Sequence, residues 1–367
     1  MVLNEIFIKN LEKKSDFLYN INYFRGIAII FIVFGHSMYL GVTILNEYPT
    51  ISYKFIEYFT TGGTTFFVFI SGFLLNHLHT KNLNFRTFFF KKIKFVLIPY
   101  LLFSSIDVLY LIVSSIISLM SGSIKTEIYL NKIKSISFIN QYFIGYSKIP
   151  IGLWYVPFIM IIFSLTKVYM KFTFLKNKIQ ILIIGLLIVL SSIIHRAPNN
   201  SIFSIFHNIL YFTPVYLLGI FSSSNSINIY LKFSGKESIF FLSALVLVFF
   251  QIKTESFGTK KVPSTIDLMI FQKSLLCIFF MIYLKKFEFK NFVLLNLLSE
   301  NSFGIFFIHG VYIWLIKLII LKFQITYKSN SIIFFCLSAL VVLIISMLTS
   351  ILIRKLLPQK SKYLIGC

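Results

Sequence analysis

The segment INYFRGIAIIFIVFGHSMYLG, residues 21–41, decides the fold class of this chain. It is almost entirely apolar, and its length matches the roughly 20 residues that a helix needs to cross a bilayer. It also carries Arg25 and His36, eleven positions apart and therefore within about 20° of one helical face. Ionisable groups inside a membrane cost about 2.5–3.5 kcal/mol each. The pair therefore indicates either a functional site or two structural roles, in which Arg25 snorkels to the headgroups and His36 makes an interhelical hydrogen bond.

The whole chain has the composition of a membrane protein. Of its 367 residues, 57% are hydrophobic and 45 are Phe, and the mean hydropathy is +0.85. A soluble domain is typically about 45–50% apolar. The formal net charge is +23, but the basic residues fall in short blocks between apolar stretches. Because the positive-inside rule produces that pattern, nucleic-acid binding is the weaker interpretation. Three cysteines give no disulfide framework.

The apolar stretches predict an all-α, polytopic integral membrane protein with about ten transmembrane helices in one bundle. Lys and Arg gather on one side, so both termini are expected in the cytoplasm. The single membrane domain would comprise a cytoplasmic segment at 1–20, the spans within 21–353 and a cytoplasmic tail at 354–367. The isolated intramembrane lysines, Lys273 among them, can mostly snorkel. The expected spans are 21–41, 58–78, 95–119, 151–170, 179–195, 203–221, 238–252, 266–284, 296–320 and 331–353.

Two segments after the first span carry candidate functional residues. In the second span, Ser71 belongs to a set of small residues that permit close helix packing or, alternatively, leave room for an acyl chain. The loop KNLNFRTFFFKKIKFVLIPY at 81–100 contains a basic cluster just before a proline. Its charges are either a topology signal beside anionic headgroups or a clamp for the phosphates of a cofactor. The cluster consists of Lys91, Lys92 and Lys94.

The later part of the chain adds weaker candidates. Trp154 opens the fourth span, as part of an interfacial aromatic belt or as a stacking platform. The segment LLSENSFGIFFIHGVYIWL at 297–315 carries Glu300, Ser302 and His309. Ser302 and His309 share a helical face, and a stripe facing the bundle interior is more favourable than lipid exposure. No metal-ligand spacing and no Ser-His-Asp arrangement is apparent, so no metal is expected.

Four segments, in this order, resemble the membrane acyltransferase-3 family: FRGIAIIFIVFGHS at 24–37, FFVFISGFL at 66–74, KKIKFVLIPY at 91–100 and SFGIFFIHG at 302–310. The resemblance implies a bacterial O-acetyltransferase of the cytoplasmic membrane. Such an enzyme moves an acyl group, usually acetyl from cytosolic acetyl-CoA, to a hydroxyl of a cell-envelope or lipid-linked carbohydrate. It also implies that Arg25 and His36 are the essential pair of the family.

The resemblance is imperfect at two places. Lys92 and Lys94 stand where the family often has an Arg-x-Arg motif, and lysine lacks the bidentate fork of arginine. Gly152 precedes a Leu-Trp pair where many members have a histidine.

The resemblance implies a mechanism in which Arg25 and the basic cluster hold the phosphates of acyl-CoA. His36 would then be either a general base for the acceptor hydroxyl or an acylated nucleophile, and the sequence leaves both open. The expected partners are acyl-CoA, a carbohydrate or glycolipid acceptor and membrane lipids, without nucleic acid; the oligomeric state is not predicted. A transporter or flippase for a glycan, or a subunit of an export complex, is the alternative, because intramembrane charges suit it equally well.

Overall fold

All regular elements in the described residues of the computed structural model are helices, which confirms the expected all-α fold. The expected cytoplasmic segment at 1–20 lies mostly outside the described residues. The structure describes residues 18–41, 50–79, 84–120, 142, 144, 145, 147, 149, 151–196, 203–255, 266–323 and 332–367.

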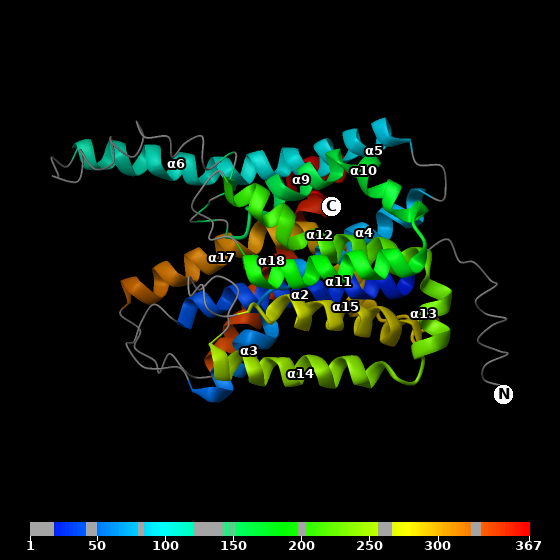
Figure 1. The fold of residues 1–367 in the computed structure, drawn as a ribbon. Helices are drawn as coiled ribbons and strands as arrows, with labels where there is room; N and C mark the ends of the chain where they lie inside the picture. Colours follow the sequence, from blue (N-terminus) through cyan, green and yellow to red (C-terminus); the bar gives the residue numbers. More distant parts are fainter. Residues whose placement is uncertain are drawn as a thin grey trace.

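The long helices lie side by side along one common direction, and the short α13 crosses one end of the bundle (Figure 1). The first elements are α2 (Tyr19–Gly41), α3 (Ile51–Thr60), α4 (Thr64–His79), α5 (Phe85–Lys92), the π-helix η1 (Ile93–Leu97), α6 (Ile98–Met120), α9 (Tyr155–Ser164), α10 (Thr166–Lys171) and the 3-10 helix η2 (Phe172–Phe174). The later ones are α11 (Asn177–Ile194), α12 (Phe203–Ser224), α13 (Ser226–Phe233), α14 (Glu237–Thr254), α15 (Met269–Lys285), α16 (Val293–Glu300), α17 (Ser302–Lys322), α18 (Ile332–Leu356) and α19 (Ser361–Ile365).

The chain is an integral membrane protein with many apolar helices. Eight helical stretches in the described residues are long and apolar enough to cross a membrane: α2, α3 with α4, α5 with α6, α11, α12, α14, α17 and α18. The pair formed by α9 and the segment Thr166–Phe174, bent by 57°, would be a ninth. With 17 residues, α15 corresponds to the expected span at 266–284. The number of crossings and the cytoplasmic location of the termini stay predictions.

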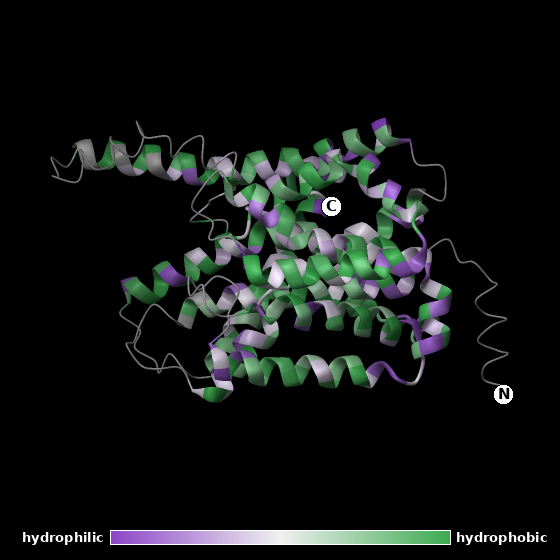
Figure 2. Cartoon of the chain, viewed as in Figure 1, coloured by the Kyte–Doolittle hydropathy of each residue, from purple (hydrophilic) through white to green (hydrophobic). Residues whose placement is uncertain are grey.

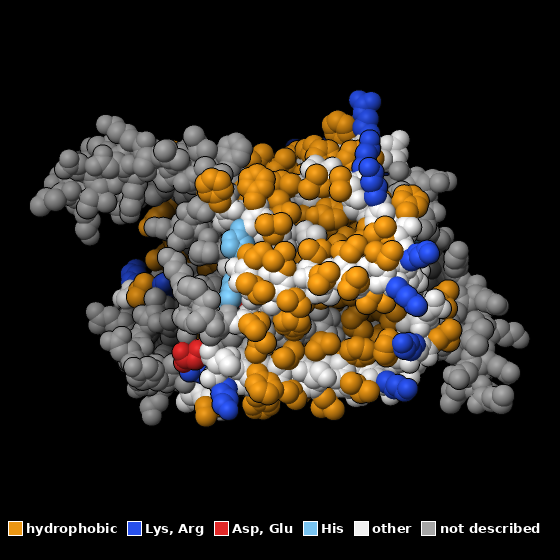
Figure 3. All heavy atoms as spheres, viewed as in Figure 1, with side chains coloured by type: hydrophobic (Ala, Val, Ile, Leu, Met, Phe, Trp, Pro, Cys, Tyr) orange, Lys and Arg blue, Asp and Glu red, His pale blue; other side chains and the backbone are white. Residues whose placement is uncertain are grey.

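The surface of the bundle fits an apolar environment. Hydrophobic residues cover the middle of the helices, and hydrophilic ones collect at their ends (Figure 2). On the face drawn in Figure 3, several Lys and Arg side chains form a row along one edge of the apolar flank. A row of cations at one edge is the distribution that the positive-inside rule predicts for a cytoplasmic boundary.

The first helix occupies the centre of the bundle. α2 packs against α3, α4, α15, α16, α17 and α18. Its residues Phe24, Ala28 and Ile29 are completely buried. A helix in this position has protein on most of its faces, so the polar groups that it carries can meet partners from several other helices.

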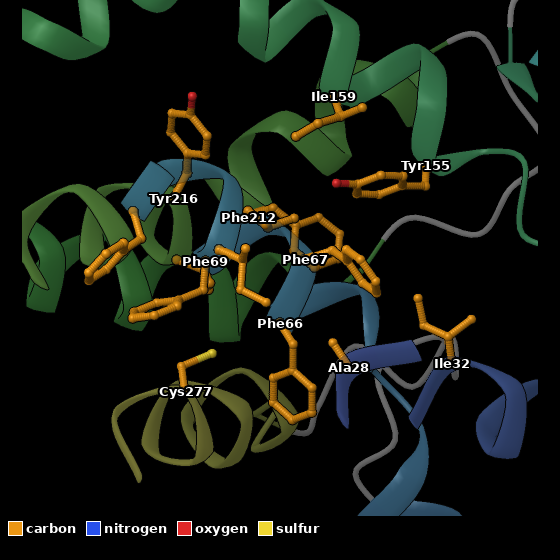
Figure 4. Packing of buried hydrophobic residues seen from close by; sticks show 14 of the residues in the cluster. Ala28, Ile32, Phe66, Phe67, Phe69, Tyr155, Ile159, Phe212, Tyr216 and Cys277 are labelled. Carbon is orange, nitrogen blue, oxygen red and sulfur yellow. The ribbon is translucent and has the colours of Figure 1, made fainter. Parts of the chain in front are cut away.

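Two glycines bring α4 and α12 into close contact. A Cβ atom added at Gly72 would lie 2.2 Å from the carbonyl oxygen of Tyr216, and one added at Gly219 would lie 2.2 Å from that of Phe69. The side chains around this contact form the aromatic part of the core (Figure 4). The small residues beside Ser71 therefore serve helix packing, because only glycine permits this backbone approach.

A buried lysine holds the break between α3 and α4. Lys273 of α15 is fully buried, and its Nζ donates a hydrogen bond of 2.5 Å to the carbonyl oxygen of Phe59 near the end of α3. The rings of Phe31, Phe59 and Phe66 lie 5.4, 5.8 and 5.7 Å from this ammonium group. Lys273 therefore does not snorkel as the isolated lysines mostly can: a backbone carbonyl and three aromatic faces take the place of water.

The expected span at 296–320 is two helices, because α16 ends at Glu300 and α17 begins at Ser302. Asn301 stands between them, and its Oδ1 accepts hydrogen bonds from Ser350 Oγ at 3.0 Å and Arg354 Nη1 at 3.2 Å. These bonds to α18 hold the break in place. As a result Ser302 is the first residue of a helix instead of a residue in its middle.

A π-helix joins the basic cluster to α6. Pro99 has no N–H, so the carbonyl group of Phe95 cannot receive its usual helical hydrogen bond from that position. Over Ile93–Leu97 the backbone takes the wider π-helical turn, and the N–H of Ile98 donates to Ile93 O. Such single π-turns are frequent at functional sites.

Candidate functional site

Three cavities follow α2 from one end to the other. We call them the inner cavity, which Arg25 lines, the neck, which Ile32 lines, and the outer cavity, which His36 lines. The inner cavity has a volume of about 140 Å³, the neck about 10 Å³ and the outer cavity about 120 Å³. Arg25 and His36, which the sequence places on one helical face, thus line two cavities with the neck between them.

The inner cavity contains two cations. Arg25 Nη2 donates a hydrogen bond of 2.9 Å to Ser302 Oγ at the start of α17. Lys92 Nζ lies 5.2 Å from the ring centre of Phe88 and 4.8 Å from that of Phe163. In the described part of the chain neither cation forms an ion pair, and no acidic side chain lines this cavity. The cavity therefore offers positive charge to an anionic ligand.

The rest of the basic cluster does not reach this cavity. Lys91 and Lys94 are exposed and do not line it, whereas Lys92 is only partly exposed and does. Ser71, another candidate from the sequence, lies in the cavity wall, and its hydroxyl group is hydrogen-bonded to Tyr155. Of the three lysines, only Lys92 therefore lies at the site, whereas Lys91 and Lys94 lie at the surface.

His36 lines the outer cavity and is paired with His309, which does not line it. His36 Nδ1 lies 2.8 Å from His309 Nε2, and the planes of the two rings differ by 6°. His309 is fully buried, and its Nδ1 lies 3.0 Å from the carbonyl oxygen of Ile305. Because a carbonyl oxygen only accepts, Nδ1 of His309 carries the proton, and in the neutral ring Nε2 is an acceptor. Nδ1–H of His36 therefore donates to His309, which leaves the lone pair of the neutral His36 ring on Nε2.

The wall opposite His36 is formed by the segment before α9. Gly152 has a φ of +94°, and a Cβ atom added there would lie 2.8 Å from His36 Cε1. Trp154 is buried and lines the same cavity, so it is not part of a lipid-facing belt. The guanidinium group of Arg196 lies 4.2 Å from the centre of the Trp154 ring and also lines the cavity.

Glu300 lies apart from both cavities. Its side chain is 58% exposed at the end of α16 and lies 3.5 Å from Arg354 Nη1. Glu300 was expected to line the interior of the bundle, because it lies in an apolar segment. Its exposed position does not support that role. The break at Asn301 turns the residue away from the stripe that Ser302 and His309 share.

Two further residues line the site without having been predicted as site residues. Tyr155 lines both the inner cavity and the neck, and Arg196 lines the outer cavity. Tyr155 directly follows Trp154, and the same choice between an interfacial belt and a stacking platform applied to both rings. Nothing in the sequence around Arg196 indicated that a loop residue would meet the first helix. No group of three or more His, Cys, Asp or Glu in the described residues is placed to hold a metal ion.

Comparison with known proteins gives one result. A family model described as "Acyltransferase domain" matches residues 18–351. We found no match among curated proteins and none among solved structures.

Proposed function

Since this chain belongs to the membrane acyltransferase-3 family, we propose that it is an O-acyltransferase of the cytoplasmic membrane that uses acetyl-CoA as donor. The acceptor would be a hydroxyl group of a cell-envelope or lipid-linked carbohydrate. One observation carries the proposal: a cationic cavity and a histidine cavity lie at two positions of the same central helix.

Binding of the donor begins at the inner cavity. The phosphate groups of acetyl-CoA need cations, and Arg25 and Lys92 supply two that have no acidic partner in the described residues. The other walls, among them Phe67 and Ile159, are apolar and suit the pantetheine arm. From Arg25 to His36 the helix rises about 16 Å, so the arm would run along α2 with its thioester toward His36.

His36 is then the proton acceptor of the reaction. Its Nε2 lone pair takes the proton from the acceptor hydroxyl, whose oxygen attacks the thioester carbonyl carbon. When the carbon–sulfur bond breaks, the same proton passes from His36 to the leaving CoA thiolate. His309 touches no reacting atom in this scheme; it fixes the tautomer of His36 and stabilises the transient imidazolium.

The acceptor would occupy the outer cavity. Its walls combine hydroxyl groups of Thr61, Thr64 and Ser147 with glycine backbone, and Trp154 adds an aromatic edge. A few convergent polar groups beside an aromatic ring are typical of small-molecule sites, and they suit the many hydroxyl groups of a sugar. The other expected form of the mechanism, an acyl group carried by His36 itself, uses the same Nε2 lone pair.

Membranes containing the protein, incubated with radiolabelled acetyl-CoA, test the function. The wild type should transfer label to glycan or glycolipid, and His36→Ala should transfer none at an equal amount of inserted protein. His77→Ala is the matched control, because His77 lies on α4 outside the three cavities. A transporter or an export subunit would move the glycan without any transfer of label, and His36→Ala would leave that movement intact.

A further inference from the structure

The neck is much smaller than the cavities on either side of it. Its volume of about 10 Å³ is at the lower limit for holding one water molecule. It shares Phe67, Tyr155 and Phe303 with the inner cavity, and Ile32 with the outer one. A ligand that reaches from Arg25 to His36 along α2 therefore has to pass this point.

The neck is built from well-packed side chains of four helices. Ile32, Phe67, Tyr155 and Phe306 are only 4–9% exposed. The rings of Tyr155 and Phe306 meet edge to face, with their centres 5.7 Å apart. Figure 4 shows Ile32, Phe67 and Tyr155 on three separate helices around the same core. Because protein interiors are close-packed, widening this passage requires helices or rings to move together.

The donor must cross the neck with its acyl group first. The nucleotide stays with the cations of the inner cavity, and the thioester has to come close to His36. We propose that the neck is a filter for the acyl group, which admits small, unbranched and uncharged groups such as acetyl and rejects branched or carboxylated ones. This inference rests on the proposed function and adds to it the class of donor.

Width is the first criterion of this filter. Next to the thioester, the arm is an unbranched chain that itself contains amide groups, and its branched pantoyl unit adjoins the phosphate groups at the inner cavity. An acetyl thioester is therefore no wider than the part of the arm that follows it through the neck. An isobutyryl group branches next to its carbonyl carbon and is wider. A pocket discriminates one extra methylene by about 10- to 200-fold, so we expect isobutyryl transfer to be at least about tenfold slower.

Charge is the second criterion. Four of the residues that line the neck are Ile32, Phe67, Phe303 and Phe306, and no cationic side chain lines it. The carboxylate of a succinyl group would lose its water there and meet only the hydroxyl groups of Tyr155 and Ser302, without a cation, which is unfavourable. Succinyl transfer should therefore also fall below acetyl transfer by at least about tenfold.

The test compares acetyl-, isobutyryl- and succinyl-CoA as donors for the purified full-length protein, with the initial rate of acyl transfer as readout. Similar rates for all three donors would overturn the filter and leave the proposed function standing. No transfer from any of the three would overturn the proposed function itself. A clear preference for acetyl over both others is the expected result.

Variants locate the filter. Phe67→Ala widens the neck and should raise the ratio of isobutyryl to acetyl rates at least about fivefold, because it removes a ring from the constriction. Phe69→Ala is the matched control: Phe69 is fully buried on the same helix but lines none of the three cavities. If Phe67→Ala does not fold, Ile32→Ala serves in its place. An equal ratio in the neck variant and in Phe69→Ala would overturn the assignment.

Discussion

His36 Nδ1 of α2 lies 2.8 Å from His309 Nε2 of α17, and a backbone carbonyl group of α17 determines which of the two nitrogens donates the hydrogen bond. The carbonyl group of Ile305 fixes the proton on His309, and His309 in turn fixes the proton on His36. His309, which contacts no reacting atom, thus determines the tautomer of His36, the proposed base.

His309→Ala should lower kcat by about 10²- to 10⁴-fold, the range attributed to a general base, while the KM for acetyl-CoA changes little. His309→Gln should recover part of the loss, because the amide oxygen of Gln can accept the proton of His36 Nδ1. Steady-state kinetics of the three proteins check this. A normal kcat in His309→Ala would contradict the role of the pair.

Arg25→Ala should raise the KM for acetyl-CoA by at least about tenfold, since a hydrogen bond to a charged group contributes about 1.5–3 kcal/mol. Lys92→Ala should act in the same direction. Lys94→Ala is the control, because Lys94 is exposed and lines none of the cavities. Binding of acetyl-CoA to the purified proteins measures the effect, and equal losses in Lys92→Ala and Lys94→Ala would contradict the selection of Lys92.

Gly152→Ala should abolish most of the activity without weakening donor binding. The new methyl group would lie 2.8 Å from His36 Cε1, and the backbone φ of +94° is unfavourable for alanine. Gly185→Ala on α11 is the matched control, because a Cβ atom there meets nothing within 4 Å. Activity and donor affinity, measured side by side, check the prediction; an active Gly152→Ala protein would show that this wall is not tight against the ring of His36.

Lys273→Ala should lower the free energy of unfolding by about 2–5 kcal/mol, because it leaves a cavity and an unpaired carbonyl group at Phe59. Lys273→Met keeps most of the volume and should lose less. Thermal unfolding in detergent compares both with Lys178→Ala, a change at an exposed residue. A midpoint of Lys273→Ala equal to that of Lys178→Ala would mean that the buried ammonium group is structurally dispensable.

The sequence was sufficient for the parts of the site that one regular helix determines. Arg25 and His36 share a face because they lie on an uninterrupted stretch of α2, and Ser302 and His309 do so within α17. It was insufficient where a helix is interrupted. The break at Asn301 removes Glu300 from the stripe, since two side chains of α18, distant in sequence, hold that break.

For a related reason, the sequence could not show which of the three lysines of the basic cluster lines the inner cavity. Regular α-helical spacing does not apply next to the π-turn at Ile93–Leu97, so the face on which each lysine lies cannot be counted from its position. Arg196 comes from a loop, and loop positions have no period from which a contact with α2 could be inferred. Tertiary contacts therefore determine both which lysine lines the inner cavity and where Arg196 lies.

The bend between α9 and α10 has a consequence for motion. The helices around the neck are tied to their neighbours at several points: α2 to α17 by Arg25–Ser302 and His36–His309, and α4 to α12 at Gly72. In the described residues, two side-chain hydrogen bonds join α9 to other elements: the one between Tyr155 and Ser71, and the one from Thr166 Oγ1 to the carbonyl oxygen of Phe163 at the bend itself. We therefore expect α9 to be the gate, pivoting at its 57° bend so that Tyr155 withdraws while the two histidines keep their distance.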